Sequence, residues 1–246
     1  MGVPVAGAAV EGDSSGDPRD TRWRCSVWVQ TGESSVVIDT SPEFRLQTLR
    51  SGLRRIDLVL ITHEHMDHIA GLDDLRPYCY RQDQTLPLYA TAQAGEAIHA
   101  RFNYMFGPDR YPGATSLDIH LADAPFEFRD LCITPLPARH GSVDVLGYRL
   151  NDFSYLTDVK EIPERTRQRI RGSRVMVLSG LRWEPDHPTH LTIPQAVEIA
   201  DELEVPRTYL IHMNSRVNHA ESNRRLPDHV RLAYDQLRLE IPENPV

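Results

Sequence analysis

The short stretch formed by residues 58–68 limits what this chain can fold into more than any other. A strand-like apolar run is followed, within six positions, by three histidines and two carboxylates. Four of them have the spacing H-x-H-x-D-H: His63, His65, Asp67 and His68. Residues two apart at a strand end point the same way, so His63 and His65 can face one metal ion. Asp67 and His68 lie where the chain turns away, and they can face a second ion. A solvated polar loop explains such a density of ligands poorly.

The segments around this motif resemble a known family. Residues 62–68 are similar to the signature of the metallo-β-lactamase superfamily. Four further segments resemble the branch that contains the phosphoribosyl 1,2-cyclic phosphate phosphodiesterases of carbon–phosphorus lyase pathways: 39–45, 71–77, 146–149 and 155–160. Ribonuclease Z and the coenzyme PQQ biosynthesis B proteins are relatives of this branch. The resemblance extends from Gly2 to about Ile241 and implies an α/β fold, an αββα four-layer sandwich of two mixed β-sheets flanked by helices.

Three later residues complete the metal site if the resemblance holds. His140 follows a strand-like run in a turn bounded by proline and glycine, and alone it would be unremarkable. Asp158 ends another strand, where it is either a turn residue or, with its two oxygens, a bridge between two ions. His212 ends a third, apolar strand. The family then implies metal 1 held by His63, His65, His140 and Asp158, and metal 2 held by Asp67, His68, Asp158 and His212.

Other residues are expected to support or contact the substrate. Asp39, at a strand end, either lies beside a helix N-terminus or holds a ligand histidine. His190 matches the family position that contacts the substrate phosphate. His219 either contacts substrate or is a plain surface histidine. His187 has no counterpart and is interpreted as a loop residue, and Glu64 as an exposed residue that need not act.

The implied activity is that of a dinuclear metal-dependent hydrolase. We expect a phosphodiesterase in which a metal-bridging hydroxide, oriented by Asp67, attacks a small phosphate ester, cyclic esters included. His190 would steady the phosphate or protonate the leaving oxygen, as suits an imidazole that titrates near neutrality. Imidazole and carboxylate ligands fit zinc or manganese. The alternatives are a ribonuclease Z-like RNA-processing nuclease and a thioester or lactone hydrolase of the glyoxalase II type. A non-enzymatic binding module that kept only the fold is disfavoured, because such a module would not need to retain every metal-ligand position.

Composition bears on partners and location. The formal net charge of −8 argues against nucleic acid as the main partner, because such binding relies on phosphate neutralisation. No apolar run approaches the roughly 20 residues that span a bilayer. Three widely spaced cysteines indicate free thiols in a reducing cytosol, and no export leader is apparent. Lys160 is the only lysine, a bias typical of a GC-rich bacterial genome. A small-molecule phosphate ester and, as a possible assembly, a homodimer are the expected partners.

We predict one domain over residues 1–246, with residues 1–21 a loop-like N-terminal segment. Family members start with an extra strand and often carry a cysteine cluster that holds a structural zinc. Here Ala8, Ala9 and Val10 occupy that region, so no structural zinc is expected. The aromatic residues between 102 and 112 either wall a substrate pocket or pack on the sheet. Residues 230–234 and 237–241 are expected to close the fold as a hairpin.

Overall fold

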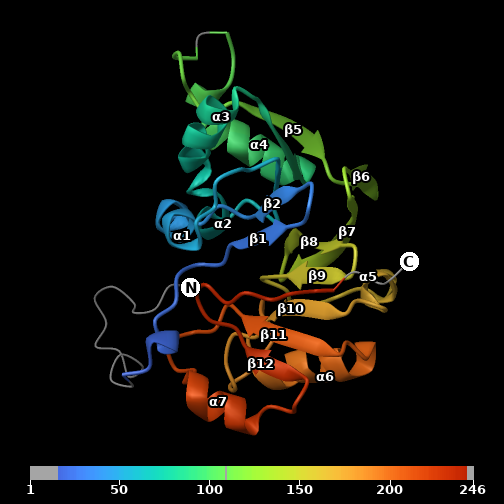
Figure 1. The fold of residues 1–246 in the computed structure, drawn as a ribbon. Helices are drawn as coiled ribbons and strands as arrows, with labels where there is room; N and C mark the ends of the chain where they lie inside the picture. The colour runs from blue at the N-terminus through green and yellow to red at the C-terminus, as the bar shows by residue number, and fades with distance from the viewer. Residues whose placement is uncertain (1–15, 109, 243–246) are drawn as a thin grey trace. The chain divides into compact units, whose positions relative to one another are not determined.

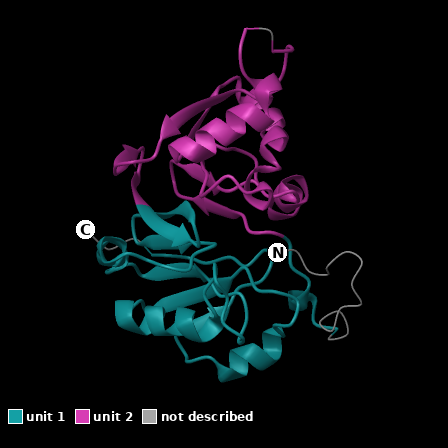
Figure 2. Ribbon diagram, turned by 180° about the vertical axis from the view of Figure 1, so that it is seen from behind, with its two compact units in different colours: residues 1–23, 136–246 teal, residues 24–135 magenta. Residues whose placement is uncertain are grey.

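The computed structural model describes residues 16–108 and 110–242, and its elements are labelled in Figure 1. The chain divides into two compact units, residues 1–23 with 136–246 and residues 24–135 (Figure 2). The prediction of a single domain stays a prediction. The segment discussed above around Gly2 and Ala8 lies outside the described residues. Pro18–Asp20 forms a 3₁₀ helix, η1, where we expected only loop.

The unit of residues 24–135 contains a five-stranded sheet in the order β1-β2-β3-β4-β5. The first pair is antiparallel and the other pairs are parallel. Every residue of β2 and β3 is buried, as expected for parallel strands covered on both faces, which read in sequence as unbroken apolar runs. The strands are β1 Val27–Gln30, β2 Ser35–Ile38, β3 Leu58–Leu60, β4 Leu86–Ala90 and β5 Leu117–Leu121.

Helices complete the core of this unit. Thr91 caps the N-terminus of helix α4, since its hydroxyl accepts a hydrogen bond from the Ala94 N–H, and the helix packs on β5. A buried cluster that includes Val59, Ile69 and Leu88 joins the sheet to the helices. The helices are α1 Phe44–Ser51, α2 Met66–Ile69, η2 Leu72–Leu75, α3 Arg76–Gln82, α4 Ala92–Arg101 and η3 Asn103–Met105.

Gly71 fixes how the chain leaves the histidine-rich turn. Its N–H donates to the Thr40 carbonyl at 2.9 Å. A Cβ at this position would lie 2.7 Å from the Phe44 Cβ and would clash with the Ser41 carbonyl. We therefore expect Gly71→Ala to lower the free energy of unfolding by about 1–3 kcal/mol, the usual cost of overpacking. Thermal melting tests this, with Gly32→Ala as control because nothing lies within 4 Å of its added methyl. Equal melting of the two variants would contradict the prediction.

The second sheet has the strand order β12-β11-β10-β9-β8-β7-β6. Its strands β8 and β9 form an antiparallel hairpin, and β9, β10, β11 and β12 run parallel. The strands are β6 Phe126–Phe128, β7 Leu131–His140, β8 Val143–Leu150, β9 Phe153–Leu156, β10 Val175–Ser179, β11 Arg207–Ile211 and β12 Val230–Leu232. The two mixed sheets confirm the predicted α/β class.

The predicted closing hairpin is wrong. Only residues 230–232 of that region form a strand, and they pair in parallel with β11. Residues 237–241 alternate apolar and polar residues but are not a strand. The Trp23 N–H instead donates to the Asp235 carboxylate, which ties this part of the chain to the N-terminal segment. Tertiary pairing has overridden a local β pattern.

Three helices accompany the second sheet: α5 Glu164–Ile170, α6 Ile193–Leu203 and α7 His219–Arg225. Helix α6 begins with a capping box, since Thr192 and Gln195 exchange side-chain and backbone hydrogen bonds. Helix α6 packs along β11 (Figure 1) and buries Ile193, Ala196 and Ala200 in the core of this unit.

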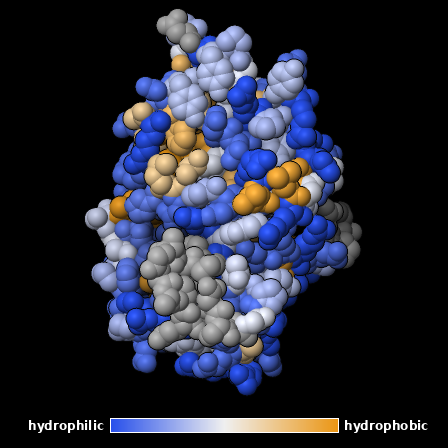
Figure 3. Space-filling view, turned by 90° about the vertical axis from the view of Figure 1, so that its left-hand side faces the viewer, coloured by the Kyte–Doolittle hydropathy of each residue, from blue (hydrophilic) through white to orange (hydrophobic). Residues whose placement is uncertain are grey.

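None of the helices in the described part of the chain combines the length and apolar character needed to cross a membrane. On the face shown in Figure 3, hydrophilic residues dominate and hydrophobic ones form small patches.

Candidate metal centre

The H-x-H-x-D-H motif occupies the turn from β3 into α2. His63 and His68 are fully buried, while His65 and Asp67 are half-buried. The His63 Nε2 and His65 Nδ1 atoms lie 3.0 Å apart. The ring centroids of His63 and His68 are 4.3 Å apart, and the His68 Nε2 lies 3.7 Å from an Asp67 oxygen. The structure therefore brings together all four predicted ligands of this unit.

Asp39 holds this turn in place. Its carboxylate accepts hydrogen bonds from the Thr62 N–H at 2.8 Å, the Thr62 hydroxyl at 2.9 Å and the His68 Nδ1 at 2.7 Å. Asp39 is completely buried and has a left-handed backbone, with φ of 62°. Of its two expected roles, holding a ligand histidine is the one observed.

These contacts set the tautomers of two histidines. Because Asp39 accepts from Nδ1 of His68, the lone pair of that ring is on Nε2. The Thr62 hydroxyl gives its proton to Asp39, so it accepts from Nδ1 of His63 at 3.0 Å. His63 Nε2 is then also a lone-pair donor. In metal-binding histidines, the ring nitrogen that does not bind the metal typically donates to a partner of this kind.

The unit of residues 136–246 contributes the other predicted ligands. His140 ends β7 and donates its Nδ1 proton to the Thr189 carbonyl at 2.7 Å. His212 follows β11, and its Nδ1 lies 2.7 Å from an Asp158 oxygen. The same oxygen accepts a 2.7 Å hydrogen bond from the Thr157 hydroxyl. Asp158 and His212 have φ angles of 52° and 59°, unusual for residues other than glycine and frequent at functional sites.

His190 lies among these residues. The ligand atoms of Asp158, His190 and His212 are within 4.8 Å of one another. The His190 ring centroid is 4.4 Å from that of His140 and 4.9 Å from that of His212. Burial, followed by the neighbouring His212, lowers the pKa of His190 to about 3. It is therefore neutral at pH 7 and does not titrate near neutrality as we expected.

The donor set fits divalent cations. Two imidazole nitrogens converge to 3.0 Å with further imidazole and carboxylate groups around them, and the fixed tautomers leave lone pairs on Nε2 of His63 and of His68. Such nitrogen and oxygen donors suit zinc and manganese. The two sets of residues belong to different units. That all seven residues hold one dinuclear centre therefore stays a prediction.

Glu64 differs from its sequence-based description, whereas His187 agrees with its own. Glu64 is buried, not exposed: its carboxylate accepts a 2.6 Å hydrogen bond from Gln93, and its carbonyl bonds Arg101. Its neighbours belong to α4, far along the chain, so no local signal reveals the contact. His187 lies in a loop, as predicted, and its ring centroid is 5.0 Å from that of His190.

His219 is buried and is not a plain surface histidine. Its backbone N–H donates to the Asp20 carboxylate at 2.7 Å, and its ring meets the Tyr234 ring edge to face at 5.7 Å. Burial, followed by the charge of Arg19, lowers the pKa of His219. Its predicted contact with substrate stays a prediction.

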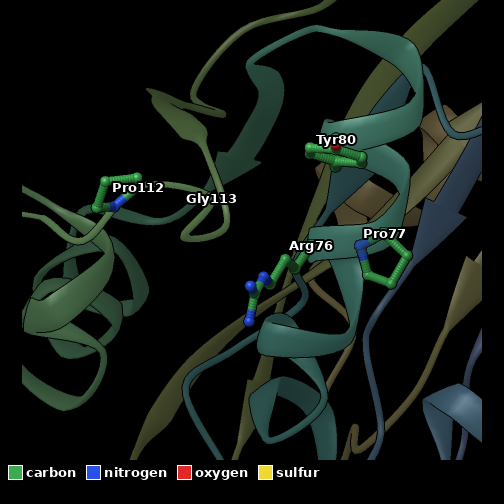
Figure 4. Close-up of a pocket in the computed structure, with 5 residues that line it drawn as sticks. All are labelled: Arg76, Pro77, Tyr80, Pro112 and Gly113. Atoms are coloured by element: carbon green, nitrogen blue, oxygen red, sulfur yellow. The ribbon is translucent and has the colours of Figure 1, made fainter.

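A cavity of about 550 Å³ lies beside α3 (Figure 4) and is lined by Arg76, Pro77, Tyr80, Pro112 and Gly113. None of the predicted ligands lines it. The aromatic residues of the 102–112 segment do not line it either. Phe102 is buried in the core, Phe106 packs against that core, and Tyr111 lies under the Arg76 guanidinium. For Phe102 and Phe106, packing is the alternative observed.

Comparisons with known proteins give a consistent family. Residues 34–213 match the family described as the beta-lactamase superfamily domain. A solved structure described as a new diphosphatase from the PhnP family superposes with a TM-score of 0.91 at 37% identity, covering 98% of this chain and 94% of that one. An octanoyltransferase of Porphyromonas gingivalis is 36% identical over 249 residues, covering all of this chain and 50% of that protein.

A more distant relative is coenzyme PQQ synthesis protein B of Xanthomonas campestris, which is 26% identical over 81% of this chain and 79% of its own. The chain thus spans half the length of the octanoyltransferase and about four fifths of the PQQ protein. These matches, together with the fold shared with ribonuclease Z, confirm the resemblance drawn from the sequence.

Proposed function

Since the chain belongs to the beta-lactamase superfamily and has the metallo-β-lactamase fold, we propose that it is a dinuclear metal-dependent phosphodiesterase for a small phosphate ester. Cyclic esters and diphosphates are included, the latter because the 37% identical relative is a diphosphatase. The observation that carries the proposal is the donor set: His63 and His68 are held in the ligating tautomer by Thr62 and Asp39.

Each proposed role follows from a side chain's surroundings. His63, His65, His140 and Asp158 would hold one zinc or manganese ion, and Asp67, His68, Asp158 and His212 the other. When bound, such ions lower the pKa of water and neutralise phosphoryl charge. The half-buried Asp67 would orient the attacking water by accepting its hydrogen bond. His190, neutral at pH 7, would donate a hydrogen bond to a phosphoryl oxygen, so we favour phosphate binding over proton transfer for it.

Two alternatives differ in substrate. A nuclease of the ribonuclease Z kind would act on RNA, and the net charge of −8 disfavours it. A thioester hydrolase would share the metal ligands. One relative is described as an octanoyltransferase, and this chain matches half of its length. We also propose a homodimer and a cytoplasmic location; light scattering during gel filtration tests the first, and cell fractionation tests the second.

A substrate panel with metal control tests the function. The panel contains bis-p-nitrophenyl phosphate, a 1,2-cyclic ribose phosphate, a pre-tRNA and an octanoyl thioester. We expect hydrolysis of the first two, loss of that activity after chelation, and recovery with zinc or manganese, because water activation needs the ions. If the protein hydrolysed only the thioester or only the pre-tRNA, a small phosphate ester would be rejected as its substrate class in favour of that one. Full activity after verified metal removal would reject metal dependence.

A further inference from the structure

We propose that His187 and Arg182 form a second anion subsite beside His190, which binds the distal phosphoryl group of a diphosphate substrate. The inference rests on the proposed function, because His190 is there assigned to the phosphoryl group that reacts. All of the residues concerned belong to one compact unit, and they lie in the segment that joins β10 to α6.

The two histidines form adjacent positions for phosphate. Their ring centroids are 5.0 Å apart with the rings tilted by 48°, and both side chains are half-buried. The two phosphorus atoms of a diphosphate are linked through one oxygen. A diphosphate can therefore place one phosphoryl group at each ring, whereas a simple phosphate diester can occupy only one position.

His187 is fixed as a hydrogen-bond donor. Its Nδ1 lies 3.3 Å from both the N–H and the hydroxyl of Thr189, and the N–H must donate to it. The ring proton is then on Nε2, where it can be donated to a phosphoryl oxygen. The Thr189 carbonyl accepts from Nδ1 of His140, so one threonine orients both a predicted metal ligand and this donor.

Gly141 allows Thr189 to approach this closely. A Cβ at Gly141 would lie 2.7 Å from the Thr189 Cγ2, and its φ of 61° also favours glycine. Burial and the charge of Arg182 lower the pKa of His187, so its ring is neutral at pH 7. It would thus act as a neutral donor in a fixed orientation.

Arg182 supplies the positive charge. Its Nε donates to the Pro185 carbonyl at 2.8 Å and its Nη2 to the Asp186 carbonyl at 3.1 Å, which puts the guanidinium over the backbone that leads into His187. The Asp186 carboxylate does not pair with Arg182, since it accepts hydrogen bonds from Lys160 at 2.6 Å and from Gln195 at 3.1 Å.

Within residues 16–108 and 110–242, Arg182 therefore has carbonyl partners but no carboxylate ion pair. Such a guanidinium retains its full charge and remaining N–H groups for an anion. Arginine binds phosphoryl oxygens through charge-assisted hydrogen bonds, which are roughly twice as strong as neutral ones.

The test measures the binding of two probes. Zinc-loaded protein is titrated by ³¹P NMR with dimethyl phosphate and with the P,P′-dimethyl ester of methylenediphosphonate, whose P–C–P bridge resists hydrolysis, and the same spectra verify that the methyl esters of both probes stay intact. We expect the wild type to bind the diphosphonate ester at least about tenfold more tightly, as one added charge-assisted hydrogen bond implies. His187→Phe and Arg182→Met should each remove most of this preference and leave the affinity for dimethyl phosphate unchanged.

Arg207→Met is the matched control, since Arg207 lies in the same unit and its described hydrogen bond is to the Glu240 carbonyl. It should keep the preference. Circular dichroism verifies folding, and His187→Asn replaces His187→Phe if the latter melts early. Equal binding of both probes by the wild type, or equal loss of both in the variants, would overturn the subsite. If the protein prefers the diphosphonate ester but hydrolyses no phosphate ester of the panel, the subsite stands and the proposed function is rejected. If it hydrolyses phosphate esters but shows no preference between the two probes, the function stands and the subsite is rejected.

Discussion

Replacing His65 with alanine is expected to strip metal from the protein and to abolish hydrolysis. The His65 Nδ1 faces the His63 Nε2 at 3.0 Å, so alanine removes one of two converging nitrogen donors. Loss of a partner that merely supports a ligand costs roughly 10–100-fold in metal affinity or activity, and loss of the ligand itself should exceed this range. Metal content by elemental analysis and turnover of bis-p-nitrophenyl phosphate measure the two effects.

The control for this variant is His120→Ala. His120 lies in the same unit on β5, is half-buried, and pairs with Asp118 at 3.0 Å. It should retain wild-type metal content and activity. If His65→Ala kept the metal content of the wild type, His65 would not be a ligand and the assignment of its motif would be wrong.

Replacing Asp39 with alanine is expected to have the largest effect on stability. The change leaves three buried donors without their acceptor, two on Thr62 and one on His68. Each such group costs roughly 1–3 kcal/mol, so we expect a loss of several kcal/mol in the free energy of unfolding. Metal affinity should also fall about 10–100-fold, because the His68 ring loses its orientation. Denaturant unfolding and metal titration measure these losses.

Asp83→Ala is the control for backbone strain in this variant. Asp83 also has a left-handed backbone, with φ of 49°, but it is exposed and ends α3. The excess cost at Asp39 over Asp83 therefore measures the buried hydrogen bonds. Asp39→Asn should fall between the two, since one acceptor oxygen remains. A similar cost at both aspartates would show that the network around Thr62 does not stabilise the turn.

Local patterns predicted the parts of the fold that depend on neighbours in sequence. The buried strand before His63 was evident from its apolar run, and the α6 capping box likewise depends only on Thr192 and Gln195, three residues apart. The four histidine-motif residues come together because only a strand end and one turn of helix separate them. These features require no knowledge of distant contacts.

Features created by distant contacts could not be predicted in this way. The Glu64 carboxylate is buried because Gln93, 29 residues further along, donates to it. His219 is buried against Asp20, 199 residues earlier in the chain. The lowered pKa of His190 results from burial among other histidines, which no local pattern shows. Residues 237–241 had a strand-like pattern but pair with no strand in the described part of the chain.

Anomalous X-ray diffraction from manganese-soaked crystals tests the central claim most directly. We expect two anomalous peaks about 3.5–4 Å apart, the separation found in two-metal sites. The predicted ligands of both units should surround them, with Asp158 contacting both ions. A single peak would contradict the account. Two peaks would also contradict it if neither contacted both a predicted ligand from residues 24–135 and one from residues 136–246.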